Sequence, residues 1–179
     1  FVWIALWLGL TMQQGLAQQV GTKDAAGDKE YARVCREYEL KSKNSVELLK
    51  AYLKQYPDSR HANRVQSMIA SAYVNEEKYE DALNAFKSCD LEALPDKERD
   101  EAVCKMATAY LKTGELKEAK VWFTMLQEVS KTHAADATFN LGYIDYAEQR
   151  YDQALKAFAS LQKDKTYAPL VPYYMGEIC

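Results

Sequence analysis

The chain has 179 residues, enough to bury a sizeable core, and 48% of them are apolar while 27% are charged. It holds seven glycines and only four prolines, a composition typical of a helical protein rather than of a β-rich or disordered one. The formal net charge is −3, with both signs interspersed and no basic tract. We therefore expect neither nucleic acid nor anionic lipid as a partner.

The first residues have the pattern of a secretion signal. Residues 1–12 are almost entirely apolar, and Ala17 closes a small-large-small triplet a few positions later. An apolar run of this length before such a triplet is typical of a signal peptide. We expect a signal peptide over 1–17 and a flexible leader over 18–27; the alternative is a buried N-terminal helix. A membrane span needs about 20 apolar residues, so we expect no integral membrane span.

From residue 28 onward, segments with a helical apolar period alternate with short turns. Pro57 ends the second segment, because a proline removes a backbone donor and clashes with the preceding turn. Gly114 lies where the chain must reverse, and glycine takes the left-handed conformation at a helix C-terminus with little cost. The pattern predicts helices near 28–42, 45–56, 61–76, 79–90, 97–113, 116–130, 133–148, 151–163 and 170–179.

A ladder of small and aromatic residues repeats about every 35 positions. Three alanines are each followed four residues later by a phenylalanine: Ala82 and Phe86, Ala119 and Phe123, Ala154 and Phe158. Thirteen residues before each alanine, a large apolar residue precedes a small one: Ile69-Ala70, Met106-Ala107 and Leu141-Gly142. This period indicates a solenoid of helix pairs. Two helices approach closely where small residues face each other, so we expect these positions to form the helix crossings.

The ladder resembles the tetratricopeptide repeat, in which a large apolar residue, a small residue and a tyrosine precede an alanine and a phenylalanine. Tyr73 and Tyr110 supply the tyrosine, whereas Asp145 stands in its place in the third repeat. The resemblance implies an all-α fold, an α-solenoid of antiparallel helix pairs in a tetratricopeptide superhelix. It divides the chain into a degenerate N-terminal pair over 28–60, repeats over 61–95, 96–132 and 133–168, and the first helix of a truncated further repeat over 169–179.

In this family the first helix of each pair lines a concave groove that binds partners. The family register places these residues on the groove: Arg64, Ser67, Ser71, Asn75, Glu101, Thr108, Lys112, Phe139, Asn140, Tyr143, Tyr146, Tyr173 and Tyr174. The earlier repeats then present a polar wall, and the later ones present aromatic side chains that can anchor a partner. The alternative is that these aromatic residues pack as core against the next helix pair, and both possibilities stay open.

The sequence does not indicate a metal, cofactor or catalytic site. The four cysteines lack CxxC spacing, and His61 and His133 are far apart beside expected helix starts, where we expect both to be solvent-exposed. No serine or cysteine is spaced to pair with a base, so we expect no enzyme activity. Cys89 and Cys104 fall on neighbouring helices and could form a disulfide; the alternative is that they are small buried residues.

The repeats are similar in style to those of Gram-negative envelope proteins. With the expected signal peptide, this implies an exported protein in the periplasm or at the outer membrane. We expect a scaffold that binds other proteins or peptides through its groove. Two alternatives stay open: a structural spacer or oligomerisation arm of a larger protein, and a non-catalytic N-terminal module of an envelope enzyme. We also expect the chain to be the N-terminal part of a longer protein, because the last repeat stops after one helix.

Overall fold

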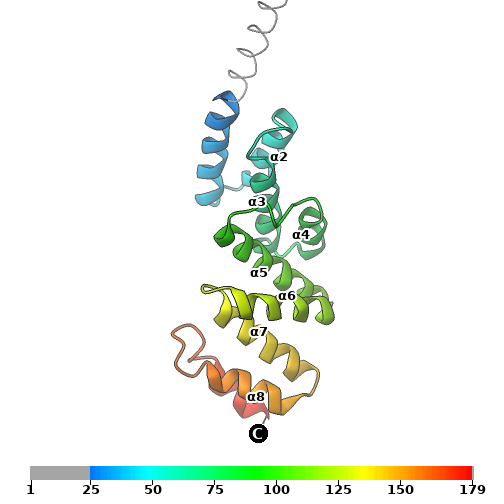
Figure 1. The fold of residues 1–179 in the computed structure, drawn as a ribbon, viewed down its shortest axis with the longest axis vertical. Coiled ribbons are helices and arrows are strands. Elements are labelled where there is room, and N and C mark those ends of the chain that lie inside the picture. The colour runs from blue at the N-terminus through cyan, green and yellow to red at the C-terminus, as the bar shows by residue number, and fades with distance from the viewer. Residues whose placement is uncertain (1–24, 179) are drawn as a thin grey trace, which may run out of the picture. The chain divides into compact units, whose positions relative to one another are not determined.

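The structure is a computed structural model that describes residues 25–178 (Figure 1). Within these residues every regular element is a helix, and the fold is the predicted α-solenoid of helix pairs. The chain divides into two compact units, Phe1–Met68 and Ile69–Cys179. The expected signal peptide lies outside the described residues, whereas residues 25–27 of the expected leader are helical.

The first unit is built from helices packed around a small apolar core. It contains a helix over residues 25–39, α2 (Ser45–Gln55) and the start of α3 (Ala62–Asn75). Val34, Leu49, Tyr52 and Val65 bury almost their whole surface. The hydroxyl oxygens of Tyr52 and Ser59 lie 2.6 Å apart, so the polar tip of the buried tyrosine has a hydrogen-bond partner.

The second unit continues α3 and adds helices in close succession. These are α4 (Tyr79–Phe86), α5 (Asp96–Thr113), α6 (Leu116–Val129), α7 (Ala134–Ala147), α8 (Tyr151–Ser160) and α9 (Val171–Ile178). From α4 to α9 each helix packs against the next along the chain (Figure 1). The connections within the predicted repeats are short, over residues 76–78, 114–115 and 148–150, and such short connections make sequential helices antiparallel neighbours.

The predicted ladder forms the interior of this unit. The ladder alanines and phenylalanines are buried, as are the small residues that precede them: Ala70, Ala82, Phe86, Ala107, Ala119, Phe123, Gly142, Ala154 and Phe158. At Gly142 an added β-carbon would lie 3.0 Å from the Ala157 β-carbon and 3.0 Å from the Phe158 ring. Helices α7 and α8 therefore cross at a distance that only a residue without a side chain allows. The atoms nearest to Gly142 belong to α8 one turn beyond Ala154.

A left-handed residue precedes the second helix of each predicted repeat. Glu77, Gly114 and Gln149 have φ angles of 60°, 85° and 59°, and each lies five positions before a ladder alanine. Gly114 is the C-terminal cap of α5, which confirms the predicted reversal there. The other two positions hold side chains that tolerate this conformation poorly, so their sequence carries no turn signal.

Two helices end earlier than the sequence predicted. Helix α4 stops at Phe86 rather than near residue 90, and α8 stops at Ser160 rather than near 163. Beyond each end the backbone makes tighter bonds three residues apart, from the Cys89 N–H to the Phe86 carbonyl and from the Leu161 N–H to the Phe158 carbonyl. Such bonds satisfy carbonyls at a helix end without extending the helix.

Candidate functional site

The predicted polar groove residues differ in burial. In the first unit, Ser67 exposes only 8% of its surface, and Arg64 lies 5.9 Å from the centre of the Tyr31 ring. In the second unit, Ser71 exposes 5%. Because both serines are buried, they offer little surface to a partner.

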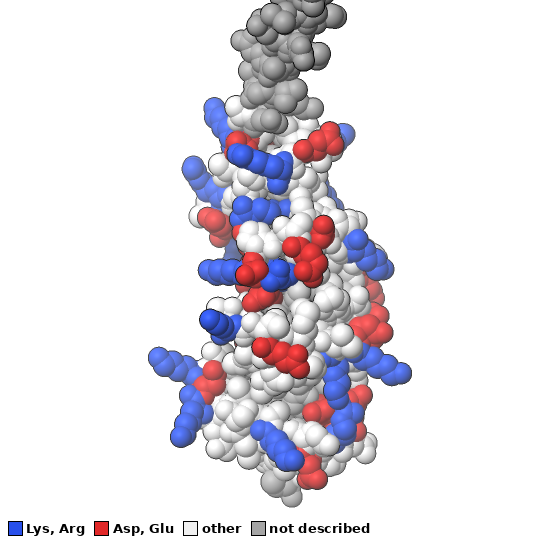
Figure 2. All heavy atoms as spheres, viewed as in Figure 1, with Lys and Arg blue, Asp and Glu red and all other residues white. Residues whose placement is uncertain are grey.

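The remaining polar groove residues belong to the second unit. Asn75, Glu101 and Lys112 are exposed, whereas the Thr108 hydroxyl and the Asn140 amide donate hydrogen bonds to carbonyls of their own helices. On the face shown in Figure 2, acidic and basic side chains are intermixed rather than gathered by sign. This distribution gives that face no large single-sign field of the kind that attracts nucleic acid.

Aromatic side chains gather where α7, α8, α9 and the 161–170 connection meet. This aromatic cluster consists of Phe139, Tyr143, Tyr146, Phe158, Tyr167, Tyr173 and Tyr174. The Phe139 ring centre is 4.5 Å from that of Tyr167, 5.5 Å from Tyr174 and 5.7 Å from Phe158. Phe139 is therefore half-buried and packs against the buried cluster that contains Phe158.

Two members of the aromatic cluster face outward. Tyr143 exposes 38% of its surface and Tyr173 exposes 65%. Both meet the half-buried Tyr174 edge to face, with ring centres 6.2 Å and 5.3 Å away. Tyr146 is half-buried and lies 6.3 Å from the same ring. We call Tyr143 and Tyr173 the exposed tyrosines; they are held by a packed ring and still reach solvent.

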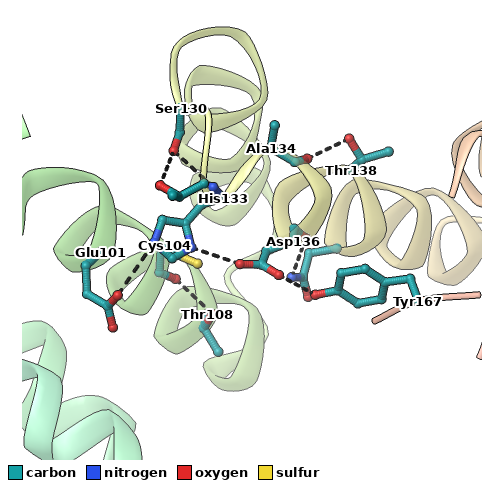
Figure 3. Close-up of polar contacts among 11 residues, drawn as sticks. Glu101, Cys104, Thr108, Ser130, His133, Ala134, Asp136, Thr138 and Tyr167 are labelled. Atoms are coloured by element: carbon teal, nitrogen blue, oxygen red, sulfur yellow. Dashed lines mark hydrogen bonds and ion pairs between the residues drawn. The ribbon is translucent and has the colours of Figure 1, made fainter. Parts of the chain in front are cut away.

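A polar cluster that the sequence did not predict lies at the start of α7 (Figure 3). This His133 cluster consists of Glu101, Cys104, His133, Asp136 and Tyr167. His133 Nδ1 is 2.8 Å from an Asp136 carboxylate oxygen, and His133 Nε2 is 3.6 Å from a Glu101 oxygen. The Tyr167 hydroxyl donates to the other Asp136 oxygen at 2.7 Å. The connection before α9 is thereby tied to α7.

Local sequence explains how the His133 cluster is positioned. Ser130 is buried, and its hydroxyl accepts the backbone N–H of His133 at 3.1 Å, which fixes the entry to α7. Asp136 lies in the first turn of α7, where a negative charge is favourable. The His133 side chain exposes 18% and the His61 side chain 15%, so the expectation that both histidines are solvent-exposed is wrong. Each is instead packed against an aspartate partner, which for His61 is Asp28.

Cys104 contributes a desolvated thiol to the same cluster. Burial raises the pKa of the Cys104 thiol to about 12, and the Asp136 and Glu101 carboxylates add to the shift. Burial and the hydrogen bond to Asp136 also raise the pKa of Tyr167. The sulfur of Cys104, a ring nitrogen of His133 and a carboxylate oxygen of Asp136 all lie within 4.8 Å of one another.

Comparison with known proteins identifies the fold and one matching repeat. Residues 136–164, inside the third predicted repeat, match the tetratricopeptide repeat family. A crystal structure of a tetratricopeptide repeat protein from Parabacteroides merdae ATCC 43184 matches with a TM-score of 0.68 over 86% of this chain, at 15% identity. The fold is thus that of a tetratricopeptide repeat protein, and residues 136–164 are similar in sequence to one such repeat. It spans 60% of the length of that relative, and a search of curated proteins found no match.

This similarity bears on function at a coarse level. Tetratricopeptide repeat proteins are generally non-catalytic scaffolds that bind other proteins. None of the helices in residues 25–178 combines the length and hydrophobicity that crossing a bilayer requires. The aromatic cluster joins residues of the matched repeat to residues of α9, so its exposed tyrosines lie where one repeat meets the next helix.

Cys89 and Cys104 lie in separate environments. Cys89 packs with the apolar cluster around α4 and α5, whereas Cys104 packs with the one formed by α5, α6 and α7. Among the described residues, Cys35, Cys89 and Cys104 form no disulfide. The possible bond between Cys89 and Cys104 is therefore not formed in this structure.

Proposed function

We propose that the protein is an exported scaffold that binds other proteins or peptides through the exposed tyrosines. The observation that carries this proposal is the geometry of Tyr143 and Tyr173, which present ring surface to solvent while packing edge-on against Tyr174. Tyrosines held in this way lose little entropy on binding, and aromatic side chains are enriched among residues that dominate interface energies. The polar residues earlier in the groove play a smaller part, since Ser67 and Ser71 are buried.

The choice between binding and packing differs from residue to residue within the aromatic cluster. Phe158 is fully buried core, and the half-buried Phe139 packs against it. Truncating an exposed tyrosine removes contact surface but leaves this core in place. Replacing Phe139 would instead remove the ring on which Tyr167 and Tyr174 pack.

The test is partner capture from envelope extract by the full chain with Tyr143→Ala and Tyr173→Ala combined. Binding of the partners that the unaltered protein retains should be lost or should weaken by about 2 kcal/mol, which is about thirtyfold in Kd. Helicity should stay unchanged. The matched control combines Val121→Ala and Val129→Ala, because these α6 residues expose 65% and 63% of their surface outside the cluster. If the tyrosine changes leave partner capture unaffected, the role of a spacer or oligomerisation arm is favoured. Sedimentation of the unaltered protein would then measure its oligomeric state.

Export is the finer part of the proposal and rests on sequence alone. Residues 1–17 have the pattern of a signal peptide, and with the style of the repeats this supports our proposal of a location in the periplasm or at the outer membrane of a Gram-negative bacterium. Mass spectrometry of protein from its native host should show a first residue near Gln18. An intact N-terminus on a cytosolic species would contradict export. It would leave the binding proposal standing, because that proposal rests on α7 and α9.

A role as a non-catalytic N-terminal module of an envelope enzyme is compatible with the same surface. In that case the exposed tyrosines would contact another domain of the same protein. The test compares partner capture by residues 1–179 with capture by a chain that continues beyond Cys179. This alternative is favoured if the longer chain fails to capture the partner and capture returns when the extension is supplied as a separate polypeptide.

A further inference from the structure

Three side chains of the His133 cluster offer ligand atoms of the kind that bind a transition metal. They are the Cys104 sulfur, a nitrogen of His133 and a carboxylate oxygen of Asp136, all within 4.8 Å of one another. Thiolate and imidazole ligands favour zinc-like ions over magnesium or calcium, which prefer oxygen ligands alone. A set of one sulfur, one nitrogen and one oxygen matches the ligand types of zinc sites.

Neighbouring residues contact the polar atoms of His133 and Asp136 that are not proposed ligand atoms. The far ring nitrogen of His133, Nε2, lies 3.6 Å from a Glu101 carboxylate oxygen. The second carboxylate oxygen of Asp136 accepts a hydrogen bond from Tyr167 at 2.7 Å (Figure 3). Residues that ligate metals are generally oriented in this way, a carboxylate on the far ring nitrogen being the commonest arrangement.

The three residues also come from helices that share one apolar cluster. Cys104 lies on α5, and its neighbours Val103 and Ala107 are buried in the same cluster as Ala137 of α7. His133 is the residue that caps α7, and Asp136 follows in its first turn. Their separation is therefore set by helix packing rather than by a loop, which keeps the ligand atoms near one another.

We propose that Cys104, His133 and Asp136 form a zinc-binding site of this protein. The ligand atoms are the Cys104 sulfur, His133 Nδ1 and one Asp136 oxygen, and the fourth position is open to water or to a side chain of a partner. Glu101 and Tyr167 orient the ligands and do not bind the ion.

Proton movements accompany binding and can be followed. The Cys104 thiol gives its proton to solvent as the sulfur–metal bond forms, because the thiolate is the ligand. His133 Nδ1 binds the ion through its lone pair, so the neutral ring in the bound state carries its hydrogen on Nε2. Nε2–H then donates to Glu101, which shortens the present 3.6 Å separation. The net change is release of one proton for each bound ion.

The experiment is titration of the reduced full chain with Co²⁺ alone, followed by Zn²⁺. Co²⁺ should give a sulfur-to-cobalt charge-transfer band that saturates at one ion per chain and disappears when Zn²⁺ displaces it. Cys104→Ala should abolish the band, and His133→Gln should weaken Co²⁺ binding by at least tenfold. Glu101→Gln should weaken it by about 10- to 100-fold without removing the band. Cys89→Ala is the matched control and should leave the band unchanged.

Several results would overturn the site. These are absence of the band in the unaltered protein, persistence of the band in Cys104→Ala, or its loss in Cys89→Ala. Helicity is measured for every variant, and if Cys104→Ala fails to fold, His133→Gln decides, since this residue caps the helix without a side-chain hydrogen bond to it. Unchanged Co²⁺ affinity in a folded His133→Gln protein would refute the proposal. The exposed tyrosines are not part of this site, so its failure leaves the partner-binding proposal untouched.

Discussion

Replacing Gly142 by alanine tests whether α7 and α8 cross as closely as the structure shows. The added β-carbon would lie 3.0 Å from the Ala157 β-carbon, 3.0 Å from one Phe158 ring atom and 3.3 Å from another. Carbon atoms pack best at about 3.5–4.0 Å, so the new atom overlaps two neighbours. Neither neighbour can move alone, because the Ala157 β-carbon is fixed to its backbone and the Phe158 ring is fully buried.

Two opposing effects set the expected change in stability. Alanine in a helix interior is favoured over glycine by about 0.5–1 kcal/mol. Forcing an extra methyl group into a packed core costs about 1–3 kcal/mol. Phe158 packs on Phe139 and Tyr174, so a displaced ring disturbs the aromatic cluster as well. We expect Gly142→Ala to lower the free energy of unfolding by about 1–2 kcal/mol.

Gly176→Ala supplies a control of the same chemistry in open space. Gly176 lies within α9, and no atom is within 4 Å of an added β-carbon. The helix preference then acts alone and should raise the free energy of unfolding by up to about 1 kcal/mol. Urea unfolding followed by circular dichroism measures both variants, with unchanged m-values as the sign that the unfolded state is comparable. If Gly142→Ala stabilises the protein as much as Gly176→Ala does, the close crossing is refuted.

Three further predictions concern turns, pH and the core. Gln149→Gly should stabilise by about 1 kcal/mol, because residue 149 has a φ of 59° that glycine adopts without strain; urea unfolding measures it. The hydrogen bond with His61 and the charge of Arg60 lower the pKa of Asp28, so its stabilising contribution exists above the unfolded-state pKa and is lost as pH falls. Thermal melts should therefore show Asp28→Asn less stable than the unaltered protein at pH 7, with the difference shrinking as the pH falls past 3.8 and gone only below the lowered pKa of the folded state. Phe123→Ala should cost about 3–5 kcal/mol in urea, since its side chain is fully buried; a loss below 1 kcal/mol would contradict the packing.

The helix pairs could be predicted from the sequence because their determinants repeat. Ala107, Ala119 and Phe123 recur in equivalent form one repeat later, and periodic burial is the strongest signal a single sequence carries. The left-handed turns could be predicted only at Gly114. At Glu77 and Gln149 the same conformation is imposed by packing of the flanking helices, and the residue type gives no sign of it.

The His133 cluster could not be predicted, because its members are distant in sequence. Cys104 comes from α5, His133 and Asp136 from the start of α7, and Tyr167 from the connection before α9. The one local signal is that a histidine and an aspartate three residues apart share a face at a helix start. Without a second ligand pair nearby, that spacing is too common to indicate a site. The apolar cluster that α5 and α7 share with α6 supplies the missing proximity.

The exposed tyrosines illustrate why periodicity alone cannot separate a binding surface from a core. Phe139 and Tyr143 are one turn apart on α7 and therefore share a face. The face is divided by Tyr167, whose ring stacks on Phe139 at 4.5 Å, whereas Tyr143 keeps 38% of its surface exposed. Tyr167 is held over Phe139 by the hydrogen bond from its hydroxyl to Asp136. The 161–170 connection is irregular and is held to the first turn of α7 by Asp136. Its position thus decides which aromatic residue of α7 is covered and which can meet a partner.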